Sequence, residues 1–197
     1  TPSGWTLLDS EFGGSGASGV DSGEALLSLY SKIADGTETG NLTVTITGGN
    51  SAVGRMLRVT GDGSGFALST TTGVDTSGGN AWSVAGAADI GITVDDLLIG
   101  FAAINSDLTF VGSGRAYTAT GVTFGTHVNR GDSVSTSGDD CGLWLVEAPV
   151  SSGTSSAAPS CTATVTGCTT DQPAGAMIFL RIRETGIRFA GSGNGSS

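Results

Sequence analysis

The sequence predicts an all-β protein: a jelly-roll-like antiparallel β-sandwich that forms a single domain over residues 1–189, followed by a flexible C-terminal tail, 190–197. Three observations predict this class. Short segments alternate apolar and hydroxyl side chains with the period of two that marks a half-buried strand. Clusters of Gly, Ser, Asn and Asp separate these segments, as turns require. The 34 Gly have no three-residue period, which excludes collagen, and 38% hydrophobic residues exclude wholesale disorder.

The N-terminal third contains four predicted strands. Trp5–Leu8 is the first of them. Glu24–Ala34 fits both a helical stripe and a strand face, and we favour a strand because the segments around it are β. Leu42–Thr47 and Met56–Thr60 alternate apolar and polar residues, so both are predicted to be half-buried strands.

Four further strands are predicted in the rest of the chain. Leu97–Ala103 and Leu143–Ala148 are short apolar runs, which suit strands that are buried on both faces. Cys161–Thr166 and Ala176–Arg183 complete the set, the latter with its Ile and Leu side chains on one face and its Arg side chains on the other. The Gly- and Ser-rich stretches are predicted to be connections: 13–23, 61–65, 70–80, 131–140 and 151–160.

The charge balance excludes two classes of partner. Lys and Arg number 8 against 18 Asp and Glu, for a net charge of −10. The few cations are scattered, so the chain lacks the basic patch that neutralises phosphates, and we expect no direct contact with nucleic acid and none with a membrane surface. The sequence also has no apolar run of the 18 or more residues that a membrane span needs.

No residue pattern predicts a catalytic, cofactor or metal site. The single histidine, His127, lies outside any nucleophile motif, and the 3 Cys lack the spacing of a zinc site. Cys161 and Cys168 are spaced so that a disulfide could close across a short hairpin, the alternative being three partly buried thiols. We therefore expect no cofactor and no enzymatic activity.

The aromatic residues suggest an alternative, a carbohydrate-binding module that recognises a receptor. Trp5 and Trp144 are expected to lie in the core, because each begins or lies within an apolar segment. Trp82 is flanked by glycines and is predicted to be exposed, where it could stack on a sugar ring. With Asp139 and Asp140, in a loop that otherwise reads as a solvated turn or a calcium loop, it would form the glycan contact.

The order of the segments resembles a pattern found in tailed-bacteriophage virion proteins. In that pattern a GWT opening is followed by a segment of the type YxKxADGxE, where x is any residue, and then by a Thr-rich strand. These match Gly4–Leu8, Leu29–Glu38 and Leu42–Thr47 here. A DLLIGFAA-like segment matches Asp96–Ala103, and the closing apolar strand matches Ala176–Arg183. The resemblance covers most of the chain with short motifs and brings no catalytic residues.

The resemblance implies a non-enzymatic structural protein of the virion: an outer capsid decoration (cement) protein or a neck or tail appendage. Its partners would be the major capsid protein or neck and tail proteins. Virion proteins act as symmetric oligomers, so a homo-oligomer is expected, with a trimer favoured by analogy. The chain departs from the pattern in the 151–160 loop and in the Cys161–Cys168 pair.

Overall fold

The computed structural model describes residues 1–13, 25–46, 51–61, 65–75, 81–104, 111–135, 141–166 and 175–186, and these residues form strands and connections without a helix. Consequently, no helix in the described part of the chain could cross a membrane. The strands are β1 (Thr6–Gly13), β2 (Ala25–Ser31), β3 (Phe66–Asp75), β4 (Ala81–Ala85), β5 (Leu97–Ile104), β6 (Val111–Thr118), β7 (Val122–Phe124), β8 (Val128–Ser135), β9 (Cys141–Gly153), β10 (Ser160–Thr166) and β11 (Gly175–Glu184).

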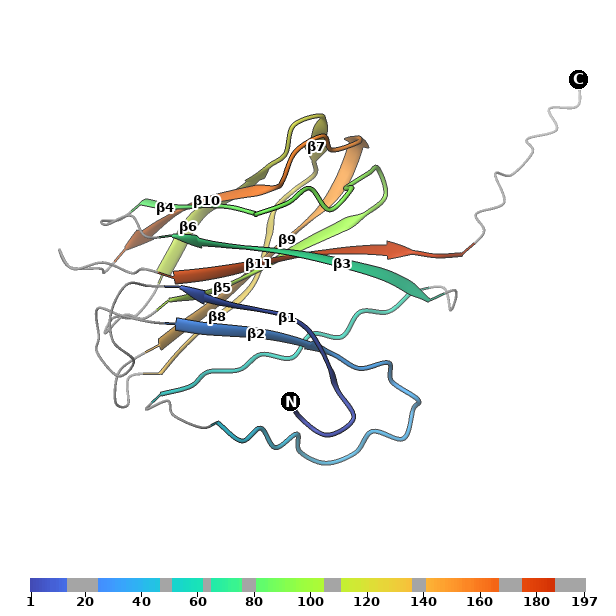
Figure 1. The fold of residues 1–197 in the computed structure, drawn as a ribbon, viewed down its shortest axis with the longest axis vertical. Coiled ribbons are helices and arrows are strands. Elements are labelled where there is room, and N and C mark those ends of the chain that lie inside the picture. The colour runs from blue at the N-terminus through green and yellow to red at the C-terminus, as the bar shows by residue number, and fades with distance from the viewer. Residues whose placement is uncertain are drawn as a thin grey trace, which may run out of the picture.

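The most apolar strands lie in the middle of the largest sheet. Its order is β3-β11-β5-β9, and β7 and β8 both pair with the remaining edge of β9. Every pairing is antiparallel. The apolar runs of β5, β9 and β11 lie in the middle of the sheet, because there both of their faces are covered by other layers (Figure 1).

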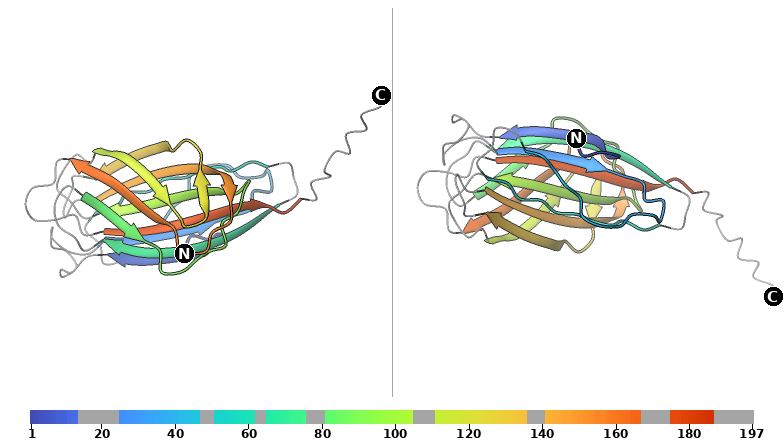
Figure 2. Two further views of the ribbon diagram at one scale, coloured as in Figure 1. Left: turned by 90° about the horizontal axis from the view of Figure 1, so that it is seen from above. Right: turned by 90° about the horizontal axis from the view of Figure 1, so that it is seen from below.

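A smaller sheet, β4-β10-β6, covers one face of this central sheet (Figure 2, left). Side chains from both sheets fill the space between them, and Trp82 of β4 meets Trp144 of β9 edge to face with ring centroids 5.7 Å apart. The cluster also contains Met177 and Phe179 of β11 and the fully buried Cys161 of β10. This interlayer is the main hydrophobic core.

A thinner outer layer covers the opposite face (Figure 2, right). It consists of the β1-β2 hairpin and of an extended segment, 51–61, that pairs with none of the described strands. Leu27 of β2 packs against Ile178 and Leu145 of the central sheet, and Leu57 of the extended segment also reaches this face. The molecule is therefore a β-sandwich with a third, partial layer.

The all-β, antiparallel sandwich predicted from the sequence is confirmed. The predicted strands Leu97–Ala103, Leu143–Ala148, Cys161–Thr166 and Ala176–Arg183 coincide with β5, β9, β10 and β11. Glu24–Ala34 is likewise a strand over most of its length, as β2. The finer jelly-roll topology stays a prediction, and the predicted tail, 190–197, lies outside the described residues.

Two predicted strands are wrong. Residues 42–46 and 56–60 are extended, but neither stretch belongs to a ladder with any described strand. Their alternation is the pattern of a half-buried strand, yet a strand also needs a neighbour to accept its backbone hydrogen bonds. The described part of the outer layer provides none for them.

Three predicted connections were drawn too long. Thr70–Asp75 is the end of β3, where it pairs with β11, and Gly131–Ser135 is the end of β8, where it pairs with β9. Residues 151–153 are the end of β9, where it pairs with β7. The Thr, Ser and Gly of these stretches favour turns in isolation, but an adjacent buried strand satisfies their backbone groups and overrides that preference.

Candidate functional site

The described residues contain no group of three or more His, Cys, Asp or Glu side chains that could hold a metal ion. Two hollows remain as candidate sites. The first lies on the outer layer and the second at the seam between the two sheets. Each is described from the elements that build it.

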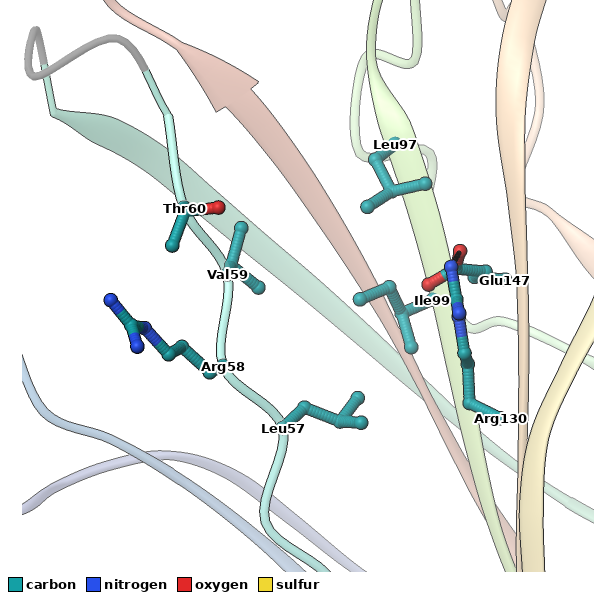
Figure 3. A pocket seen from close by; sticks show the side chains of 8 residues that line it. All are labelled: Leu57, Arg58, Val59, Thr60, Leu97, Ile99, Arg130 and Glu147. Carbon is teal, nitrogen blue, oxygen red and sulfur yellow. Dashed lines mark hydrogen bonds and ion pairs between the residues drawn. The ribbon is translucent and has the colours of Figure 1, made fainter.

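The first hollow, which we call the outer groove, has a volume of about 320 Å³ and lies between the extended segment and the central sheet (Figure 3). Leu97 and Ile99 of β5 form its apolar floor. Leu57 and Val59 approach from the opposite side, while the side chain of Arg58 points away from the groove. The groove exists because a single extended stretch, and not a paired hairpin, covers this half of the sheet.

An ion pair forms the polar side of the outer groove. The Arg130 guanidinium of β8 donates through Nη2 to Oε1 of Glu147 on β9. This hydrogen bond and the charge of the carboxylate raise the pKa of Arg130 above its ordinary value. The Arg130 side chain is half exposed, so the pair contributes little to stability but gives the groove a charged rim.

The second hollow, which we call the polar seam, has a volume of about 260 Å³ and is lined by Gly114, Arg115, His127, Asn129 and Val146. It lies where β6, an edge of the small sheet, faces the connection between β7 and β8. Among the described residues the two sheets are not joined by backbone pairing at this side, so the side chains of the seam link them.

Arg115 forms that link. Its Nη2 donates to Oδ1 of Asp132 on β8 at 2.6 Å, and its guanidinium lies 4.9 Å from the ring centroid of Trp144. The side chain is 4% exposed, and its Nε and Nη1 have no hydrogen-bond partner in the structure. The ion pair with Asp132 and the indole face compensate part of the cost of burying this cation.

His127 is used by the fold. Its Nε2 accepts a hydrogen bond from the Tyr117 backbone N–H at 2.7 Å, and its ring lies against Tyr117 and Phe124. Burial lowers the pKa of the imidazole, which favours the neutral form that can accept this bond. The nitrogen that would take a proton from a nucleophile is therefore already occupied by the backbone.

The prediction that Trp82 is exposed, on which the proposed glycan contact rested, is wrong. Trp82 is 2% exposed and lies in the main core, because β4 alternates and turns both Trp82 and Val84 toward the central sheet. The flanking glycines suggested exposure, whereas the period of two within Ala81–Ala85 was the signal that could have placed it correctly. Asp139 and Asp140 lie outside the described residues. Trp144 is fully buried, as predicted.

Cys161, one half of the possible Cys161–Cys168 disulfide, carries a free thiol in the interlayer core. Between Cys161 and Thr166 the strand is continuous and spans about 16 Å at ~3.3 Å per residue. Two further residues of chain return at most about 7.6 Å, whereas a disulfide needs Cα atoms within about 7 Å. Closing the pair would require β10 to open. Cys168 itself lies outside the described residues.

Sequence reasoning missed two buried charged clusters. Arg115 is an isolated cation in a polar stretch, and only its position two residues before the buried Tyr117 indicated an inward side chain. At the far end of β11, Arg183 forms an ion pair with the buried Asp96, and Arg181 donates to the Ile90 carbonyl. The latter cluster ties the 86–96 connection to the central sheet.

Comparisons of the chain with protein-family models, with curated proteins and with solved structures found no match.

Proposed function

We propose that the chain is a non-enzymatic structural protein of a tailed-phage virion, located on the outer capsid or on a neck or tail appendage, and that it works by contact with other virion proteins. The sequence resemblance suggests the particle. The observation that carries the proposal is the outer layer, which leaves apolar side chains without a cover.

We define the outer arm as residues 32–46 and 51–61, the extended parts of the chain that follow β2 and precede β3. Six of its apolar residues are exposed, from 39% at Val59 to 95% at Ile33. The others are Leu42, Val44, Ile46 and Met56. Apolar side chains gathered on one exposed element are typical of an interaction surface, because a soluble chain gains nothing by leaving them in water.

The remaining features agree with a contact role. Both hollows are lined by side chains that the fold already pairs, Arg130 with Glu147 and Arg115 with Asp132. A net charge of −10 is unfavourable for contact with packaged DNA and suits the outside of a particle. The aromatic platform on which the carbohydrate-binding alternative rested is part of the core.

The proposal is tested on purified particles of the phage whose genome encodes the chain. Quantitative mass spectrometry should detect the chain in particles that have passed through a density gradient, at a fixed ratio to the major capsid protein. If the chain stays with the lysate and is absent from such particles, the proposal is wrong.

A further inference from the structure

We infer that the polar seam binds a small carboxylate, which accepts hydrogen bonds from Arg115 at the buried end of the seam and from His127 and Asn129 nearer to solvent. This inference goes beyond the proposed structural role and does not depend on it. Three properties of the seam support it: a buried cation with donors left over, a lining that offers donors, and a positive local charge.

The first property is the set of donors that Arg115 retains. A guanidinium carries five N–H groups in one plane, and the ion pair with Asp132 uses Nη2. Nε and Nη1 are buried and have no hydrogen-bond partner in the described part of the chain. Native proteins bond the large majority of buried donors, because a buried donor without a partner is costly. An acceptor that enters the seam would supply the partner that Arg115 lacks.

Two β-bulges shape the seam. In β6 the register against β10 shifts next to Gly114, whose φ is +62°, and in β8 the register against β9 shifts between Asn129 and Gly131. A bulge bends its strand and changes the direction of the neighbouring side chain, which here is the inward-lying Arg115. A Cβ on Gly114 would meet nothing within 4 Å, so the space beside Arg115 is open.

The second property is a lining whose side-chain acceptors are already used. Nε2 of His127 accepts from the Tyr117 backbone, so the neutral ring carries its proton on Nδ1 and can donate it in a hydrogen bond. Oδ1 of Asn129 accepts from the Gly131 backbone N–H at 2.8 Å, which leaves the amide NH₂ as a donor. His127 is half-buried and Asn129 is exposed, so these donors lie nearer to solvent than Arg115. Donors at both depths match a ligand that accepts.

The third property is charge. Arg115 is the only charged residue among the described residues that line the seam. Its partner Asp132 also contacts a second cation, because Nη2 of Arg55 donates to the Asp132 carbonyl at 2.7 Å. Glu147 lies in the outer groove, on the other face of the central sheet, where it pairs with Arg130. Two cations and one carboxylate therefore give this point a net charge of +1, which one monoanion neutralises.

The size of the seam and the shape of the guanidinium narrow the ligand to a carboxylate. The volume of about 260 Å³ is just below the range of about 300–1,000 Å³ that holds drug-sized ligands, so the ligand is small. A planar guanidinium matches the geometry of carboxylate and phosphate oxygens. A dianion would exceed the single positive charge, whereas a carboxylate balances it.

The experiment titrates the purified chain with sodium acetate, with sodium chloride added to hold the ionic strength constant. Acetate should raise the melting temperature in a saturable manner, because it binds the folded state. In ¹H–¹⁵N spectra it should also shift one Arg Nε–H resonance, which Arg115→Gln removes. Sulfate, a dianion at neutral pH, should bind more weakly than acetate.

Two pairs of variants locate the effect. Arg115→Gln should abolish the response to acetate, whereas Arg58→Gln, which removes the same charge from the exposed outer arm, should retain it. Gly114→Asp and Gly114→Asn add side chains of equal size that both tolerate a positive φ. Gly114→Asp should raise the dissociation constant at least about 10-fold more than Gly114→Asn does, because it places a carboxylate where the ligand binds. This second pair keeps the test valid if Arg115→Gln does not fold.

A melting temperature that responds to acetate no more than to chloride would overturn the inference. Equal binding by Gly114→Asp and Gly114→Asn would also contradict it, and tighter binding of sulfate than of acetate would contradict the choice of a carboxylate. The presence of the chain in virions is measured separately on purified particles, so the two proposals can fail independently.

Discussion

Trp82 and Trp144 meet between the two sheets at the centre of the molecule, and their burial assigns Trp82 to the hydrophobic core. Both side chains are at most 2% exposed, and their rings meet at an interplanar angle of 72°. An indole in this position supports the core and offers no face to a ligand. Its replacement should affect stability before anything else.

We predict that Trp82→Ala lowers the free energy of unfolding by about 3–5 kcal/mol, because it removes a large apolar side chain and leaves a cavity. Ser83→Ala is the matched control. The Ser83 side chain is exposed and its backbone N–H, which bonds Asp75, is retained, so its change should stay within about 0.5 kcal/mol. Urea unfolding followed by circular dichroism measures both. A loss below about 1 kcal/mol for Trp82→Ala would contradict the buried position.

The Cys161 thiol should be inert in the native protein. It is fully buried, and burial raises its pKa to about 12. Since thiolates are the reactive form, a thiol reagent at neutral pH should label Cys141, which is partly exposed, and leave Cys161 unlabelled. Under denaturing conditions without reductant, we expect three reactive thiols. A count of one would show that Cys161 and Cys168 are bonded and that β10 is not continuous.

His127 gives stability a dependence on pH. The folded state lowers its pKa below the ordinary value of 6.5, so the unfolded chain binds more protons as the pH falls through this range. The contribution of neutral His127 to the free energy of unfolding is therefore fully present above pH 6.5. It is lost as the pH falls from 6.5 toward the lower pKa that His127 has in the folded state. The hydrogen bond accepted from Tyr117 is lost on protonation.

His127→Gln provides the measurement, because Gln keeps an acceptor and does not titrate. Unfolding curves recorded between pH 7.5 and pH 5 should show a smaller loss of stability in the variant than in the wild type. The acidic residues are the same in both proteins, so their contribution cancels in the difference. Parallel loss in the two proteins would contradict the role given to His127.

At the scale of the elements, the edge of the sandwich depends on a close approach between β3 and β4. Thr72 of β3 accepts a hydrogen bond from the Ala87 backbone at 2.8 Å, just beyond the end of β4. A Cβ placed on Gly73 would lie 2.1 Å from the Ala85 carbonyl oxygen and 2.7 Å from the Val84 side chain. Glycine at position 73 lets the two sheets meet at this edge.

We therefore predict that Gly73→Ala destabilises the protein by about 1–3 kcal/mol, since a backbone carbonyl must move to make room. Gly54→Ala, in the outer arm, is the comparison. A Cβ there meets nothing within 4 Å, so the substitution should be neutral or stabilising by up to about 1 kcal/mol. Thermal melts of the two variants should differ clearly, and equal melts would show that β3 and β4 do not approach in this way.

The strands also show which part of the fold was predictable. Leu97–Ala103, Leu143–Ala148 and Ala176–Arg183 carry enough apolar residues to require burial wherever they lie, so each segment alone indicated a central strand. Leu42–Thr47 carries an equally clear alternation, but whether a neighbour is present to pair with it is a property of the whole chain. Trp82 illustrates the same limit. The glycines beside it indicate a connection, whereas its place in β4 sets the direction of its side chain toward the core.

The candidate site left no signal in the sequence. The outer groove could not be predicted, because it arises where Leu57 and Val59, from an unpaired segment, lie beside Leu97 and Ile99 of a distant strand. Such a surface is formed by tertiary packing and leaves no local pattern in the chain.

At the scale of the whole molecule, the three layers differ in completeness. The central and small sheets bury their facing sides fully, whereas the outer layer is a hairpin beside a single extended stretch. The outer arm beside this incomplete layer contributes six exposed apolar side chains, and residues 32–61 carry a net charge of +1 in an otherwise acidic chain. The molecule is thus closed on one face and suited to contact on the other.

We propose that the chain is a structural component of the virion and is held there through its outer layer, and cryo-electron microscopy of the purified particle is the test. We expect density for the three-layered sandwich on the outer surface of the capsid, neck or tail, with the outer arm buried against a neighbouring subunit. Particles that lack this density, or that hold the chain with its outer arm facing solvent, would contradict it.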